Sequence, residues 1–437
     1  DSKIFALSNP ESVPMRPTLL ALLLSSLLST AALAQTPPPP PPGGPAGGPP
    51  PGAPGSQRYS LEQALSDQAQ LHTIAFSGLA FLTGDFASDT FLPPGKVSDY
   101  FGFQYMRDID TASGGHQGAF LTRIAHAMLA LLTPEQRTLL IELARLQQPE
   151  VRRFAERRLP LIQAFRQQLD GRPLSGPGAL SQAAVMKYSA ELYELDGKLA
   201  YQRAKVMAHI VRSLDAQQRQ ALARMKFGDS RTWPNAPEVL DKRQFSHDVH
   251  VLVMTYASEM FSWAAGSLEA DVYFCPERHG MYFGGFGMKT APAIGHPDYA
   301  ISTALTGDSG QALLALLTPE QRGALTELPA AQRADLAEIV RLRRQIASEL
   351  RKLLNGEPAD QAKVLAASRR YGELDGRLSW RYGMAFARIQ ASLSPPQRAQ
   401  LARLRPPTGP GEPKGPFIYS EPVRNLSVGD SGFLFSR

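Results

Sequence analysis

The sequence predicts an all-α protein made of two homologous helical-hairpin domains that form an intramolecular pseudo-dimer. The first supporting observation is a duplicated heptapeptide, LLTPEQR, at residues 131–137 and again at residues 316–322. The second is a further match in the same order, ELDGKL at residues 194–199 and ELDGRL at residues 373–378. The third is a helical spacing of apolar residues in both halves. Collinear matches of this kind indicate duplication of a unit of about 180 residues, much longer than a solenoid repeat.

The first 34 residues are predicted to be an upstream extension and a signal peptide. Residues 1–14 lack an initiator Met, and their origin stays open. After Met15 a cation, Arg16, precedes an apolar run that ends in the small residues Ala32 and Ala34. This order is typical of an export signal, so we expect cleavage after Ala34 and a periplasmic or secreted protein. No later segment reaches the length of a membrane span, so no span is expected after cleavage.

Amino-acid composition divides the rest of the chain into a linker, a central region with the repeats, and a tail. Two Pro/Gly-rich segments, unsuited to a packed core, flank the region that carries the repeats. The second of them is expected to be a loosely held tail. The predicted boundaries are 35–58 for the linker, 59–228 for the first LTxxQ helical domain, 229–246 for a connector, 247–404 for the second LTxxQ helical domain and 405–437 for the tail.

Each domain is expected to contain two long helices that pack as an antiparallel hairpin. Apolar residues step by three and four, which places them on one helical face. Gly356 is a plausible end for one of these helices. By contrast, residues 85–118 and 267–299 are rich in Gly and aromatic residues, and we expect long loops with short helical pieces there. The stripes contain Ile339, Leu342, Ile346, Leu350 and Leu353, then Tyr371, Leu374, Leu378, Ala385, Ile389 and Leu393, with Leu192, Leu195, Leu199, Val206, Ile210 and Leu214 as counterparts in the first half.

The LTPEQ segment reads as a helix start. Thr318 stands at the N-cap, where its hydroxyl accepts a hydrogen bond from the third helical amide, and Gln321 reaches back to the cap amide. Pro319 fits the first helical position, which needs no amide donor, and it biases Thr318 towards extended geometry. Glu320 complements the positive end of the helix dipole. The motif therefore predicts a structural role for its residues.

Four helix starts follow this pattern, two in each half, and each comes after a leucine. They resemble the motifs of the Spy/CpxP-like LTxxQ proteins of the bacterial envelope over roughly residues 120–215 and 305–400. Proteins of that family carry two such motifs per subunit on a small helical fold and pair into a cradle-shaped dimer, and they include ATP-independent chaperones and heavy-metal-responsive relatives. The motif residues here are Leu132, Thr133 and Gln136; Leu214, Asp215 and Gln218; Leu317, Thr318 and Gln321; and Leu393, Ser394 and Gln397.

No catalytic motif points to an enzyme. GDSG at residues 307–310 and 429–432 matches the nucleophile segment of trypsin-like proteases, but the strand-rich pattern of their double barrel is missing. Signatures of zinc proteases, dithiol redox proteins, c-type haem proteins and P-loop nucleotide-binding proteins are absent from the sequence. We therefore expect a non-catalytic protein that requires no cofactor.

One segment has the residue types of a soft-metal site. Its thiol, imidazole and two thioethers suit Cu or Zn. The lone Cys cannot form an internal disulfide, and a buried cysteine within an aromatic and Met-rich core is the alternative. The candidate ligands are Cys275, His279, Met281 and Met288.

The repeated aromatic residues offer a candidate surface for unfolded chains, although they could equally fill space between helices. They are Tyr100, Phe101 and Phe103 in the first half and Tyr282, Phe283 and Phe286 in the second.

The sequence thus predicts an exported ATP-independent chaperone-like or envelope-stress protein that binds unfolded or partly folded envelope proteins on a helical cradle. The net charge of +6 favours acidic partners, but no dense Lys/Arg block indicates nucleic acid. The alternatives are a periplasmic heavy-metal sensor or scavenger near Cys275 and His279, and a structural docking module. A monomer that acts as a pseudo-dimer and a homo-oligomer are both compatible with the sequence.

Overall fold

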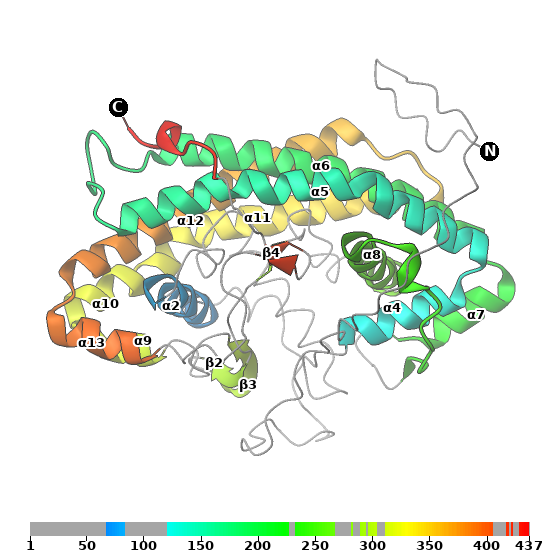
Figure 1. Ribbon diagram of the computed structural model, residues 1–437, viewed down its shortest axis with the longest axis horizontal. Helices are drawn as coiled ribbons and strands as arrows, with labels where there is room; N and C mark the ends of the chain where they lie inside the picture. The colour runs from blue at the N-terminus through cyan, green and yellow to red at the C-terminus, as the bar shows by residue number, and fades with distance from the viewer. Residues whose placement is uncertain are drawn as a thin grey trace, which may run out of the picture. The chain divides into compact units, whose positions relative to one another are not determined.

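The computed structural model describes residues 67–83, 120–226, 232–266, 281–282, 289–293, 296–303, 311–404, 417–418, 421–422 and 428–436. These residues are mostly helical, which confirms the all-α class (Figure 1). Among the described helices, none combines the length and the apolar character that a membrane crossing requires. The helices are α2 (Asp67–Thr83), α4 (Phe120–Leu131), α5 (Pro134–Leu169), α6 (Gln182–Ser213), α7 (Ala216–Arg224), α8 (His247–Ala265), α9 (Gln311–Leu316), α10 (Pro319–Thr326), α11 (Leu328–Arg351), α12 (Gln361–Ser392) and α13 (Pro395–Leu404), with 3₁₀ turns η5 (Lys242–Gln244), η7 (Lys352–Asn355) and η8 (Gly432–Leu434).

Short strands correct the expectation for the second aromatic loop, residues 267–299. In its described part the backbone forms strands and not short helical pieces. β2 (Lys289–Ala293) and β3 (His296–Thr303) pair antiparallel, and β1 (Met281–Tyr282) pairs with β4 (Phe417–Ile418), which also pairs with β5 (Glu421–Pro422). The β1–β4 pairing joins residues far apart in sequence, and local helical spacing carries no signal for it.

The predicted hairpins are present in both repeats. α5 pairs with α6, and α11 pairs with α12. The helix that carries Ile339 to Leu350 continues into η7 and ends at Gly356, where the backbone is left-handed with φ +81°. Only glycine adopts that conformation without cost, so the sequence located this helix end correctly.

The two repeats meet where α6 packs along α12. Two aromatic side chains show that the helices run antiparallel: the Tyr201 hydroxyl donates to the Ala359 carbonyl at 3.0 Å, and Trp380 Nε1 donates to the Leu180 carbonyl at 2.9 Å. Tyr201 and Trp380 occupy the same place after the two ELDG segments. Equivalent residues of the two repeats therefore make equivalent contacts across this seam.

Glycines allow the close approach of α6 and α12. A Cβ atom on Gly376 would lie 2.8 Å from the Ser189 Cβ, and one on Gly197 would lie 2.6 Å from the Ser368 Cβ. Both distances are shorter than real carbon–carbon contacts. The two ELDG glycines are therefore packing residues of the seam, and each faces a serine of the other repeat.

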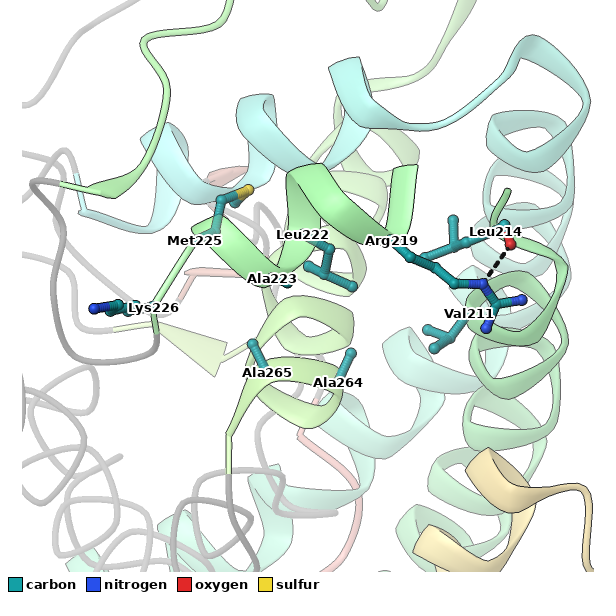
Figure 2. A pocket seen from close by; sticks show the side chains of 9 residues that line it. All are labelled: Val211, Leu214, Arg219, Leu222, Ala223, Met225, Lys226, Ala264 and Ala265. Carbon is teal, nitrogen blue, oxygen red and sulfur yellow. Dashed lines mark hydrogen bonds between the residues drawn. The ribbon is translucent and has the colours of Figure 1, made fainter. Parts of the chain in front are cut away.

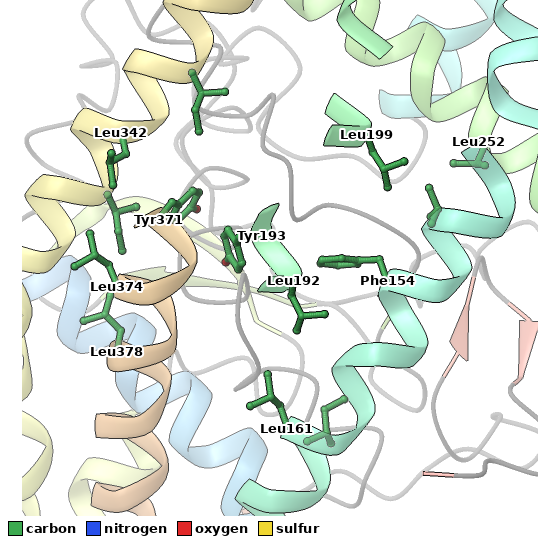
Figure 3. Close-up of a cluster of buried hydrophobic side chains, with 14 of the residues drawn as sticks. Phe154, Leu161, Leu192, Tyr193, Leu199, Leu252, Leu342, Tyr371, Leu374 and Leu378 are labelled. Atoms are coloured by element: carbon green, nitrogen blue, oxygen red, sulfur yellow. The ribbon is translucent and has the colours of Figure 1, made fainter. Parts of the chain in front are cut away.

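The core continues from one repeat into the other across this seam. Figure 3 shows leucine and aromatic side chains of α5, α6, α11 and α12 in one cluster. At its centre the rings of Tyr193 and Tyr371 meet edge to face with centroids 4.7 Å apart. Contacts group the described residues into one compact unit.

Two helices cross between the repeats. α2 precedes the first motif copy but packs on α9 to α13 of the second repeat, whereas α8 packs on α4 and α5 of the first repeat (Figure 1). Buried hydrogen bonds hold both crossings: the Tyr256 hydroxyl donates to Gln147 Oε1 at 2.7 Å, and Gln332 Nε2 donates to Gln70 Oε1 at 3.1 Å. Each repeat therefore completes the core of the other.

The end of the predicted tail differs from the expectation of a loosely held segment. Residues 428–436, which we call the docked segment, lie against the connection between α5 and α6. Leu180 and Phe435 form an antiparallel bridge, and the side chain of Leu434 is fully buried. Backbone pairing and one buried apolar residue hold this part of a Gly-rich segment that composition alone assigns to flexible chain.

Candidate functional site

The four motif copies form the helix starts that their sequence predicts. At the first copy, Thr133 has extended geometry with φ −67° and ψ 163°, its hydroxyl accepts from the Gln136 amide at 3.2 Å, and Gln136 Oε1 accepts from the Thr133 amide at 3.0 Å. Asp215, Thr318 and Ser394 make the same reciprocal pair of bonds with their own glutamines.

The helix starts lower the pKa of the acidic residues in their first turns. The pKa of Glu135 is lowered, first by hydrogen bonding to its own backbone amide and then by the Thr133 hydroxyl. The pKa of Glu320 is lowered by the same two causes, with Thr318 as the second partner. Both carboxylates are therefore held in the charged form that suits a helix N-terminus.

The two motifs of the first repeat meet in space, which their sequence did not reveal. Gln218 Nε2 donates to Gln136 Oε1 at 2.7 Å and to the Leu131 carbonyl at 2.9 Å, where α4 ends. Gln136 Nε2 donates to the carbonyl and the hydroxyl of Ser213 at 3.3 and 3.0 Å, where α6 ends. We call Leu131, Gln136, Ser213 and Gln218 the first motif cluster. It ties together the ends of four helices.

The second repeat builds the same arrangement. Gln397 Nε2 donates to Gln321 Oε1 at 2.8 Å and to the Leu316 carbonyl at 3.0 Å, and Gln321 Nε2 donates to the Ser392 carbonyl and hydroxyl at 3.0 and 3.1 Å. These four residues are the second motif cluster. Its glutamines are partly exposed, whereas Gln136 and Gln218 are each 8 % exposed.

Sequence reasoning missed the arginine that follows each glutamine. Every one of the four arginines donates from its guanidinium to the carbonyl of the motif leucine five positions earlier, at 2.8 to 3.1 Å. An arginine in all four copies was a signal that the sequence offered. The pairs are Arg137 with Leu132, Arg219 with Leu214, Arg322 with Leu317 and Arg398 with Leu393.

An open pocket of about 440 Å³ adjoins the first motif cluster (Figure 2). Its apolar wall comes from the ends of α6 and α7, with Val211, Leu222 and Met225. Two alanines near the end of α8 complete it, so both repeats contribute to the pocket. Arg219 and Lys226 supply positive charge at its edge. An apolar side chain next to a carboxylate matches this lining.

A buried ion pair lies deeper in the first repeat. Arg203 Nε on α6 is 3.0 Å from Glu259 Oε2 on α8, and the two side chains are 0 and 1 % exposed. The guanidinium carbon lies 5.1 Å from the centre of the Tyr256 ring. Burial raises the pKa of Tyr256. This group fixes the crossing helix α8 against α6.

Most of the ligand-binding candidates from the sequence lie outside the described residues. This holds for Cys275, His279 and Met288 of the proposed metal site. It also holds for the aromatic residues Tyr100, Phe101, Phe103, Phe283 and Phe286. Of Met281 and Tyr282 the structure describes the backbone alone, as strand β1. Within the part of the chain that is described, no three His, Cys, Asp or Glu side chains come together as metal ligands.

No protein-family model, no curated protein and no solved structure matches the chain.

Proposed function

We propose that the protein is an ATP-independent chaperone-like protein of the bacterial envelope that holds unfolded polypeptides. The observation that carries the proposal is the pair of LTxxQ motif clusters, built with the same hydrogen bonds in both repeats. In the proposal the two repeats act as an intramolecular pseudo-dimer joined at the seam of α6 and α12. The equivalent contacts of Tyr201 and Trp380 support this pairing.

The chemistry of the clusters fits a structural scaffold. Their glutamine amides and cap hydroxyls are occupied by helix ends, and the arginine side chains bind carbonyl groups. Groups committed to the backbone in this way set the positions of helices and not the course of a reaction. A client would therefore be held by the surfaces that these helices present.

In the proposal, clients bind at the pocket beside the first motif cluster. Its apolar wall would accept an aliphatic or aromatic side chain, and Arg219 and Lys226 would favour a neighbouring acidic residue. Contacts of this kind are weak and depend on salt, because exposed charges are screened within about 10 Å at 0.1 M salt. Such contacts suit a protein that binds many unfolded chains and releases them without ATP.

Suppression of aggregation tests the proposal. The chain starting at residue 35 should slow the light scattering of a reduced, unfolding test protein, and added salt should weaken this effect. Ala223→Asp places a negative charge on the pocket wall and should reduce the effect, whereas Gln220→Asp adds the same charge on the exposed face of α7 outside the pocket. Equal aggregation with and without the parent protein would refute the proposed function. Equal loss in both variants would refute the role of the pocket.

A further inference from the structure

The docked segment turns through η8 and then pairs its last residues antiparallel with the connection between α5 and α6. The Gly178 amide donates to the Ser436 carbonyl, the Ser436 amide donates to the Ala179 carbonyl, and the Ser181 amide donates to the Leu434 carbonyl, each at 2.8 Å. Main-chain hydrogen bonds of this type hold a peptide without depending on its side chains.

Side chains of the docked segment add a sequence preference to these main-chain bonds. Leu434 is fully buried, and the Arg172 guanidinium lies over the ring of Phe435 at 4.5 Å. Phe433 packs on Tyr188 with ring centres 5.2 Å apart but stays 51 % exposed. We call the surface under the docked segment, formed by Arg172, Tyr188 and residues 178–181, the groove. It accepts a leucine followed by an aromatic residue, and it leaves the side chain before the leucine half exposed.

In the second repeat the equivalent hairpin connection is closed without a docked segment. Ser181 and Asp360 are equivalent N-caps, of α6 and α12. In the first repeat the Ser181 amide is satisfied by Leu434 of the docked segment, whereas in the second the Asp360 amide donates to Glu349 Oε1 at 2.7 Å. In the second repeat a side chain of its own hairpin therefore takes the place that the docked segment fills in the first.

We propose that this groove is a peptide-binding site that the docked segment occupies in competition with client polypeptides. Its second occupant is a segment of an unfolded client in which a leucine precedes an aromatic residue. The identity of that occupant rests on the proposed function, whereas the exchange of the docked segment does not. Because the segment belongs to the same chain, it competes with a client as an intramolecular ligand, and the effective concentration of such a ligand can reach the order of mM. The groove is therefore closed until a client competes or the segment is released.

Peptide binding tests the exchange directly. The probe is a fluorescent peptide of residues 427–437, and its anisotropy is measured with the full chain and with a variant that lacks residues 428–437. The variant should bind the probe at least tenfold more tightly than the full chain, because its groove lacks the tethered competitor. A probe carrying Leu434→Asp should not bind, whereas a probe carrying Phe433→Ala should bind nearly as well as the parent.

Two results would overturn the proposal. One is a variant with unchanged helical circular dichroism that fails to bind the probe, and the other is equal binding by the variant and the full chain. If the variant unfolds, hydrogen exchange of the full chain shows whether the segment is released without unfolding of the fold. The amides of Gly178, Ser181 and Ser436 should then exchange together and well before the core of α6. Exchange of these amides only with the α6 core would mean that the segment is a permanent part of the fold.

The aggregation assay separates this inference from the proposed function. Deleting the segment should increase suppression of aggregation if clients use the groove, and excess probe peptide should reverse the increase. Probe binding without any effect on aggregation would support the exchangeable site and reject clients as its second occupant.

Discussion

Replacement of Gln218 by Ala tests whether the paired motifs hold the helix ends together. The change removes the donors to the Leu131 carbonyl and to Gln136 Oε1, and it removes the acceptor of the Asp215 amide at 2.9 Å. A typical hydrogen bond contributes about 0.5–1.5 kcal/mol net, and a buried partner left without one costs about 1–3 kcal/mol. Since the Asp215 carboxylate still caps the helix, we expect the free energy of unfolding to fall by about 2–4 kcal/mol.

The second repeat supplies a matched control. Gln397→Ala removes the same three bonds, to Leu316, Gln321 and Ser394. Because this glutamine is partly exposed, water replaces much of what is lost, and the expected cost is about 1–2 kcal/mol. Gln218→Met keeps the volume of the side chain without its polar atoms, so it should cost nearly as much as Gln218→Ala.

Urea unfolding followed by far-ultraviolet circular dichroism measures these differences, provided that the slope against urea concentration is the same for all variants. If Gln218→Met unfolded at the same urea concentration as the parent, the amide hydrogen bonds of Gln218 would contribute nothing to stability. A cost for Gln397→Ala equal to that for Gln218→Ala would show that burial of the first motif cluster does not matter.

Three more changes test the seam of the two repeats, the ion pair of Glu349 and the candidate metal ligands. Gly372→Ala should lower the free energy of unfolding in urea by about 1–3 kcal/mol, because its Cβ would lie 2.6 Å from the Ser189 carbonyl oxygen. Gly323→Ala, with no atom nearer than 4.0 Å, should instead stabilise α10 by up to about 1 kcal/mol. The opposite order would contradict this packing. The Lys352 ammonium and the Asp360 amide lower the pKa of Glu349 below 4.5, so its contribution to stability is present above that pH and is lost as the pH falls through the lowered value. The melting temperature of Glu349→Gln should therefore depend less on pH in this acidic range than that of the parent. An unchanged pH profile would argue against this role of Glu349. The metal hypothesis predicts that the chain starting at residue 35 binds Cu or Zn more tightly than its Cys275→Ser variant in a calorimetric titration, and equal affinity would remove it.

Local features of the fold could be read from the sequence because neighbouring residues decide them. A Thr or Asp followed three residues later by Gln forms a cap within one helical turn, and Gly356 ends its helix because its backbone is left-handed. The arginine after each glutamine acts over the same short range, so the four copies already contained the signal for its role.

The tertiary structure decided which distant groups meet. Nothing in the spacing of the motifs shows that Gln136 and Gln218 bond to each other, because that contact depends on the path of α5 and α6 between them. Composition assigned residues 428–436 to a tail, but main-chain bonds to Ser181 and its neighbours hold them in place.

Two repeats, their long helices and the four helix starts could be recognised in the sequence, since each depends on contacts within a few residues. The crossing of α2 and α8 to the opposite repeat, and the serines that face the ELDG glycines across the seam, became visible only in the packed fold. Sequence spacing does not specify them, because burial of apolar surface is not directional. An apolar helix face can be covered by either repeat, and only the packing of the whole chain selects one.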